Sequence, residues 1–138
     1  MKKILLSVSI ILCSILSYSQ NSCDLVVKVE NIKEVKGSLK IAIYNQEDHF
    51  LSKEMMSDGK MIDSNQVEFI FKGLGEGTYA ISLYHDENDN GKLDANFIGI
   101  PSEPYAFSNN AKGMFGPPSF AECKFEVKGP AQEIVISL

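Results

Sequence analysis

Asp86 opens a short stretch in which side-chain oxygens recur at every second residue. Asn88 and Asn90 follow it, Gly91 occupies the sixth position, and Asp94 lies three residues further along. This arrangement is the first part of the calcium-loop pattern D-x-[DN]-x-[DN]-G. Ca²⁺ binds about six to eight oxygen atoms, and this spacing can direct several of them toward one point. The stretch therefore predicts a calcium-binding loop.

The surroundings of this loop differ from those of an EF-hand. Lys92 can contribute its backbone carbonyl at the seventh position, but Phe97 stands at the twelfth, where an EF-hand has a bidentate glutamate. Alternation over 79–84 predicts a strand before the loop, not a helix. We therefore expect a calcium loop on a β-scaffold, completed by Glu103. So few carboxylates predict a Kd on the order of 10⁻⁴ to 10⁻³ M. The alternative is a polar hairpin tip, because Asn-Gly favours a tight β-turn.

Catalytic constellations are scarce in this sequence. His49 and His85 are the only histidines, and there is neither a Gly-x-Ser-x-Gly elbow nor a His-Glu-x-x-His zinc motif. His85 follows the apolar phase of Leu83, so we expect a hydrogen-bonded histidine at the edge of the core. Asp86 and Glu103 would form a glycosidase pair only with a suitable carboxyl separation across a cleft. The sequence therefore predicts a protein that is not an enzyme.

The N-terminus has the pattern of a secretory signal peptide. Lys2 and Lys3 precede an apolar run over 4–16, and polar residues follow, so we place cleavage after Gln20. The run is too short to span a bilayer, and we expect no transmembrane span elsewhere. Cleavage leaves residues 21–138 as one exported domain, periplasmic or extracellular, with 11 basic and 18 acidic residues. This acidic balance argues against nucleic acid, whose binding depends on cationic contacts to phosphate.

Two cysteines, Cys23 and Cys123, remain after this cleavage. An even number in an exported chain favours a disulfide, and both alternate in phase with apolar neighbours, which directs both thiols toward the core. We expect a Cys23–Cys123 disulfide. The alternative is two separate buried thiols, because a bond requires Cα atoms within bonding range.

Six segments alternate between apolar and polar residues with a period of two. Such alternation is typical of antiparallel strands buried on one face, and a series of short strands separated by turns predicts a β-sandwich. We expect an all-β, antiparallel sandwich of about seven strands, with a short helix within 47–56. The alternating segments are 25–30, 39–44, 67–72, 79–85, 121–127 and 133–138.

The segment 97–119 lacks alternation and is rich in apolar residues, glycine and proline. A long loop of this composition is ordered and not a solvated linker, so we expect a packed loop beside the 86–94 stretch. Its aromatic residues either cap the sandwich core or form a ligand-stacking surface. For the second alternative, the candidates are Tyr105, Phe107, Asn109 and Asn110, whose rings and amides suit a glycan.

A run of short motifs resembles an exported bacterial family known as domain of unknown function 2141. The resemblance covers essentially all of 21–138, and Ala106 stands where the family would have glycine. It implies export and a sandwich similar to immunoglobulin-like or transthyretin-like domains, and it implies no known activity. The motifs are GTYAI at 77–81, HDEN at 85–88, NGKLD at 90–94, GIPSEPY at 99–105, FSNNA at 107–111 and FGPPSF at 115–120.

These features favour an exported, non-catalytic binding or adhesion module. Loops at the end of a rigid sandwich are where binding sites commonly lie. The expected partner is a glycan or an envelope protein. The alternatives are a structural subunit of an envelope assembly, which would pair through exposed strand edges, and, less favoured, a carbohydrate-active enzyme.

Overall fold

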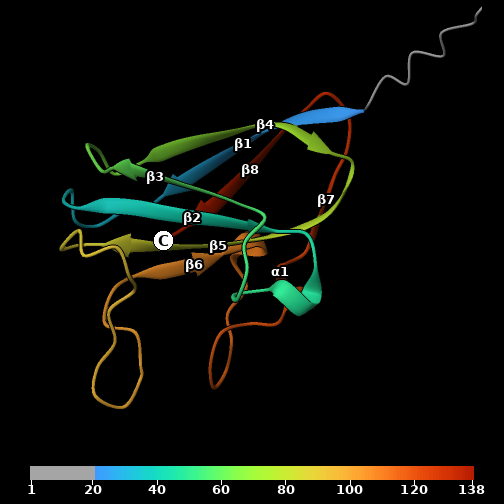
Figure 1. Cartoon of the computed structure of the whole chain (residues 1–138). Coiled ribbons are helices and arrows are strands. Elements are labelled where there is room, and N and C mark those ends of the chain that lie inside the picture. Colours follow the sequence, from blue (N-terminus) through green and yellow to red (C-terminus); the bar gives the residue numbers. More distant parts are fainter. Residues whose placement is uncertain (1–20) are drawn as a thin grey trace, which may run out of the picture.

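The computed structural model describes residues 21–138, so the predicted signal peptide and its cleavage site lie outside the described residues. Two sheets pack face to face (Figure 1). The smaller has the strand order β4-β1-β8, and the larger has the order β3-β2-β5-β6, with β7 paired to one end of β5. The predicted all-β sandwich is confirmed, with eight strands. The strands are β1 (Ser22–Glu30), β2 (Ser38–Tyr44), β3 (Met56–Met61), β4 (Val67–Gly75), β5 (Gly77–Asp86), β6 (Tyr105–Phe107), β7 (Phe125–Val127) and β8 (Ala131–Ser137).

The core lies between the sheets and is built by the predicted alternation. In β1, Leu25, Val27 and Val29 are fully buried, whereas the residues between them reach the surface. β1 pairs antiparallel with β4 and parallel with β8, so that Val27 faces Phe69 on one side and Ile134 on the other. Burial on one face of each sheet thus fixes the register, because a one-residue slip would turn the apolar set outward.

A second, smaller cluster covers part of the outer face of the larger sheet. Ala80, Phe107 and Cys123 are buried there, against partly buried Phe50 and Phe120. Helix α1 (Phe120–Cys123) supplies part of this cover. The predicted strand over 121–127 is therefore wrong in its first half. A capping box explains the difference: the Ser119 side chain accepts from the Glu122 N–H, and the Glu122 carboxylate accepts from the Ser119 N–H.

The segment between β2 and β4 also differs from the prediction. The expected helix within 47–56 is a single 3₁₀ turn, η1 (Glu47–His49), and strand β3 then starts at Met56. All six residues of β3 are exposed. β3 is an edge strand with no buried face, so it has no alternation by which the sequence would reveal it.

The predicted disulfide is absent, and Cys23 and Cys123 are free, buried thiols. Both side chains do point into apolar surroundings, but into different ones. Cys23 lies in the core between the sheets, whereas Cys123 lies with Ala80 in the cluster on the outer face of the larger sheet. The sheet containing β5 therefore separates the two sulfur atoms. Alternation predicted burial correctly and did not distinguish the two faces.

Both thiols are predicted to be unreactive in the native protein. Burial raises the pKa of both thiols, that of Cys123 to about 11, and only the thiolate form of a cysteine attacks a disulfide reagent. Residues 21–138 should give no fast reaction with a disulfide reagent such as DTNB when folded, and two thiols per chain after unfolding without reductant. Reductant should leave the melting temperature unchanged. Finding no thiol after unfolding would instead establish the disulfide.

Candidate functional site

The end of β5 turns around the buried carboxylate of Asp86. Its Oδ1 accepts from the Asn90 N–H at 3.0 Å and its Oδ2 from the Gly91 N–H at 2.8 Å. Gly91 has φ +82°, which suits glycine. β2 begins beside this turn, where a Cβ on Gly37 would come within 2.2 Å of the Asp86 carbonyl oxygen. The spacing that suggested a calcium loop thus builds a closed turn around one carboxylate.

The other predicted ligands of the turn bond with one another. The Asn88 amide donates to Asp94 Oδ2 at 2.7 Å, and the Asn90 amide donates to both oxygens of Asp94 at 2.8 and 3.0 Å. These amides, that of Asn90 first, lower the pKa of Asp94, so this carboxylate is charged at neutral pH. Lys92 is exposed, and its N–H donates to Asn90 Oδ1. The five predicted ligands from Asp86 to Asp94 therefore lie in one hydrogen-bonded loop.

Glu103, predicted as a calcium ligand of this loop, joins it to the next one through backbone N–H groups. Oε1 accepts from the Glu87 N–H and Oε2 from the Asp94 N–H, both at 2.9 Å. Glu103 is buried, and its two bonds fasten the beginning and the end of the 87–94 loop to the base of the loop that follows. Across residues 21–138, no group of three or more histidine, cysteine, aspartate or glutamate side chains is arranged to hold a metal ion.

The loop between Asp94 and Glu103 ends in a tight turn, which we call the first tip (residues 96–99). The Asn96 carbonyl accepts from the Gly99 N–H, and its side-chain oxygen accepts from the N–H groups of Ile98 and Ile100. Ala95 and Pro101 pair below the turn. Phe97 at the apex is 98% exposed, so the first of the two alternatives for the aromatic residues of 97–119, a cap on the sandwich core, does not hold for this residue.

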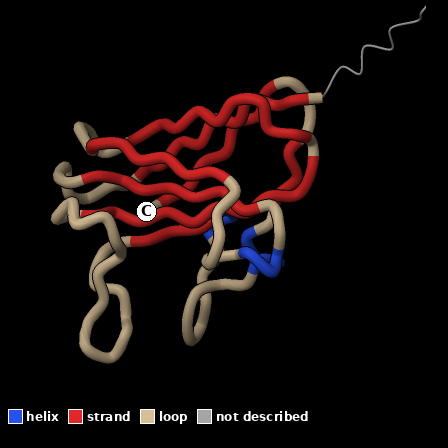
Figure 2. Tube along the Cα trace, viewed as in Figure 1, coloured by secondary structure: helices blue, strands red, loops and turns tan. Residues whose placement is uncertain are grey.

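A second loop follows β6 and contains the second tip (residues 113–116). Gly113 and Gly116 approach so closely that a Cβ on Gly113 would lie 1.8 Å from the Gly116 carbonyl oxygen. The two residues between these glycines, Met114 and Phe115, are 91% and 101% exposed. Both loops leave the β6 side of the larger sheet and project in the same direction (Figure 2).

A hollow of about 860 Å³ lies between the two loops. Its floor is the outer face of β5 and β6, where Tyr84 and Tyr105 are directly paired across the strands. Ile98 and Ile100 line it from the first loop, and Met114 from the second. The hollow therefore combines apolar walls with tyrosine side chains on a rigid sheet.

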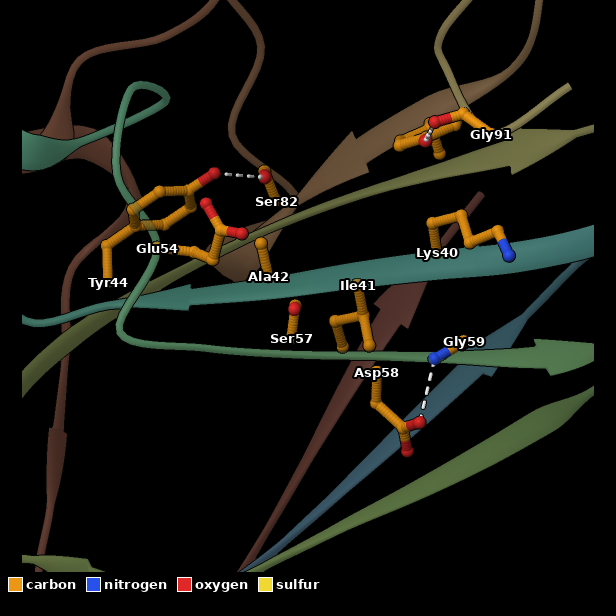
Figure 3. A pocket seen from close by; sticks show the side chains of 11 residues that line it. Lys40, Ile41, Ala42, Tyr44, Glu54, Ser57, Asp58, Gly59, Ser82 and Gly91 are labelled. Carbon is orange, nitrogen blue, oxygen red and sulfur yellow. Dashed lines mark hydrogen bonds between the residues drawn. The ribbon is translucent and has the colours of Figure 1, made fainter.

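A second, more polar hollow of about 570 Å³ continues along the same sheet face toward the edge strand β3 (Figure 3). Lys40, Glu54 and Asp58 line it, and Tyr44 lies within hydrogen-bond distance of Ser82 at 3.3 Å. Tyr44, Ser82 and Tyr84 line both hollows. One continuous surface thus runs from a charged end at β3 to an apolar end between the loops.

The residues predicted for glycan stacking are only partly available. Phe107 is buried in the outer cluster. The Asn109 amide donates to the carbonyls of residues 122 and 124, and Asn110 Oδ1 accepts from the Ser137 N–H. Both asparagines have positive φ, so their role is to shape the backbone after β6. Asn109 and Asn110 are exposed but held by these bonds, and Tyr105 is 45% exposed on the floor of the larger hollow.

The exposed tips were missed in the sequence, although a signal for them exists. Each tip has two large apolar residues bracketed by turn formers, as Asn-Phe-Ile-Gly at 96–99 and Gly-Met-Phe-Gly at 113–116. Side chains at the two central positions of a tight turn point away from the protein. His85, in contrast, lies where the sequence placed it: it is buried, and its Nε2–H donates to the Lys36 carbonyl at 2.8 Å.

The two bonds that Glu103 accepts from the N–H groups of residues 87 and 94, which we call the Glu103 clamp, predict that Glu103→Gln destabilises the fold more than the same substitution at a surface glutamate. Glu103→Gln replaces an accepting oxygen by an NH₂ group, which leaves one partly buried N–H without its acceptor and should lower the free energy of unfolding by about 1–3 kcal/mol. Glu133→Gln is the control, because this carboxylate is half exposed in a surface ion pair with Lys28. Denaturant unfolding of both variants measures the difference. Equal, small changes would contradict the clamp.

Comparison with known proteins identifies the family. A family model described as an uncharacterized protein conserved in bacteria (DUF2141) matches residues 27–135, which include all of β2 to β7 and both tips. No curated protein and no solved structure matches the chain. The resemblance noted in the motifs is confirmed, and since the model covers well over half of the sequence, the chain belongs to the DUF2141 family.

Proposed function

We propose that this protein is an exported, non-catalytic binding module whose ligand lies in the hollow between the two loops. The observation that carries the proposal is this 860 Å³ hollow, walled by two loops and floored by a rigid sheet. Ligand sites are commonly concave and mostly apolar, with a few polar groups that orient the ligand. Tyr105 supplies such a group here, and β5 holds the floor in place.

The walls favour an apolar ligand over a sugar. Ile100, Pro101 and Met114 offer hydrocarbon surface and no hydrogen bonds, while the amides of Asn109 and Asn110 are engaged in the protein itself. The ligand of this proposal is therefore an apolar group or an apolar segment of an envelope protein. Tyrosine hydroxyls at the floor would bind its polar end.

The proposal that the protein is not a catalyst is supported by the hydrogen bonds of the three candidate catalytic side chains. Asp86 and Glu103 each accept two backbone N–H groups, and His85 is bonded to a backbone carbonyl. A general acid or base must reach a substrate proton, whereas these three side chains are buried.

A structural subunit that assembles through strand edges receives less support. β3 is the exposed edge of the larger sheet, but Asp58 and Lys60 lie on it. Charged side chains on an edge strand oppose pairing with another chain.

We further propose that Ca²⁺ stabilises the 86–94 loop. The support is the spacing of its oxygens and the position of the buried Asp86 carboxyl group beside the partly accessible Asp94. Ser38, the cross-strand partner of Asp86, adds a buried hydroxyl with no hydrogen-bond partner among residues 21–138. If one Asn amide rotates, its oxygen joins those of Asp94, which gives the ion several oxygens at one point.

Calcium is expected to raise the melting temperature of residues 21–138 by a few degrees. At roughly 10–100 times Kd, the ion should add about 1–3 kcal/mol to the free energy of unfolding. Calorimetry with Ca²⁺, with Mg²⁺ and with EGTA measures this. Asp94→Ala should remove the rise. Asp89→Ala is the control and should keep the rise, because residue 89 lies between the predicted ligands 88 and 90 and is not one of them. A full rise in Asp94→Ala would exclude this loop as the site.

The hollow is expected to bind an apolar dye. Anilinonaphthalene sulfonate fluorescence should increase with the native protein, and Ile100→Asp should weaken binding by about tenfold or more, because it puts a charge on the wall. Ile70→Asp is the matched control, since Ile70 is 50% exposed on β4 and Ile100 is 55% exposed. An equal loss in both variants, or no binding, would reject the hollow as a site.

A further inference from the structure

The two tips together present three of the most exposed large apolar side chains of the described chain. Phe97 stands at the apex of the first tip, and Met114 and Phe115 stand at the apex of the second. Large apolar side chains that are held fully in water usually mark a surface that contacts a protein or a membrane. The shape of the tips decides between these two partners.

The tips are protrusions and not a flat patch. Both loops extend away from the sheet (Figures 1 and 2), and the side chains of Phe97, Met114 and Phe115 in their terminal turns are almost fully exposed. A protein partner would need a deep pocket for each protruding tip, whereas the hydrocarbon of a bilayer surrounds protrusions of any shape. The geometry therefore favours a lipid surface.

The backbone of the first tip is also suited to a region without water. The N–H groups of Ile98, Gly99 and Ile100 all donate to the backbone or side chain of Asn96. In hydrocarbon, an unpaired backbone donor costs several kcal/mol, so inserted segments must satisfy their donors internally. A tip that functions in water has no such need, because water can accept those bonds.

The distribution of charged residues also favours a lipid surface as the partner. The chain has 18 acidic residues, yet between positions 95 and 121 the only acidic residue is Glu103 and the only basic residue is Lys112. Glu103 is buried and bonded to two N–H groups. The projecting loops therefore carry no exposed carboxylate that an anionic lipid surface would repel, and insertion needs little electrostatic attraction.

We infer that the two tips insert together into the surface of a lipid bilayer, with Phe97, Met114 and Phe115 among the acyl chains. The inference rests on the proposed binding function and names its partner: the apolar hollow then opens toward the lipid and receives an acyl chain or a lipid-attached group. The polar end of the surface near β3 stays in water.

Tryptophan reporters test this insertion directly. The sequence contains no tryptophan, so Phe97→Trp and Phe115→Trp each give a single reporter in residues 21–138. These residues include every strand of both sheets and both apolar clusters. Phosphatidylcholine vesicles should shift the emission of both reporters to the blue, and bromine-labelled acyl chains should quench it. Met61→Trp, on the exposed edge strand β3, should show neither effect.

Vesicle sedimentation measures the contribution of the tips. Phe97→Ser combined with Phe115→Ser should lower the vesicle-bound fraction by about tenfold or more, since two large apolar groups no longer enter the hydrocarbon. Met61→Ser combined with Ile70→Ser is the matched control and should bind like the unchanged protein. High salt should leave binding intact, because the tips carry few charges.

The results separate this inference from the proposed function. Dye binding in the hollow without any blue shift at residues 97 and 115 would overturn the lipid inference alone. Insertion of both reporters without dye binding would reject the hollow and keep the lipid surface. A blue shift without vesicles, together with a concentration-dependent dimer mass, would show that the tips dock into a second copy of the chain, and would overturn the inference.

Discussion

Two buried carboxylates organise the end of the sandwich. Asp86 accepts the N–H groups of Asn90 and Gly91, and Glu103 accepts those of residues 87 and 94. Removing a carboxylate from water is costly unless its oxygens are well satisfied, and here backbone donors of an irregular segment provide that satisfaction. Each carboxylate in turn fixes the backbone of a loop segment that is not paired with a strand of either sheet. Without these four bonds, the loop after β5 and the base of the first tip would share only the Ser102 N–H to Asp94 carbonyl bond and side-chain packing.

This constraint has a consequence for recognition. Loops that are ordered before binding lose less conformational entropy when a ligand arrives. The first tip is fixed at its base by Glu103 and at its apex by Asn96, and the second tip by the close approach of Gly113 and Gly116. Apolar side chains held outward in this way stay in contact with water, so their surface adds no hydrophobic free energy to the stability of the fold. Such exposure is understandable when a partner removes the same surface from water, and it has no explanation in the stability of the isolated chain.

The sequence predicted what depends on local periodicity and missed what depends on distant partners. Alternation in 25–30 and 67–72 predicted strands that pair, and the phase of Leu83 placed His85 at the edge of the core. It did not reveal β3, because an edge strand with no buried face has no period. The same limit explains the cysteines: phase predicts burial, but the packing of α1 on the outer face decides that Cys123 and Cys23 lie on opposite sides of a sheet. The sequence predicted Glu103 as a calcium ligand of the 86–94 loop, whereas the bonds that join it to this loop come from backbone N–H groups, which have no sequence signature.

The same hydrogen bonds bear on the proposed binding of calcium to this loop. Each Asp86 oxygen accepts one N–H and retains capacity for a cation, because a carboxylate offers about four acceptor positions. Asn88 and Asn90 are different, since their oxygens accept from the N–H groups of residues 90 and 92 while their NH₂ groups face Asp94. Turning an amide oxygen toward the ion breaks one of these backbone bonds, so part of the binding energy offsets that loss. Under the calcium binding proposed above, this competition would make the affinity low. The ion would redistribute bonds within the loop, and Glu103, which accepts from the N–H of residue 94, would pass that change to the base of the first tip.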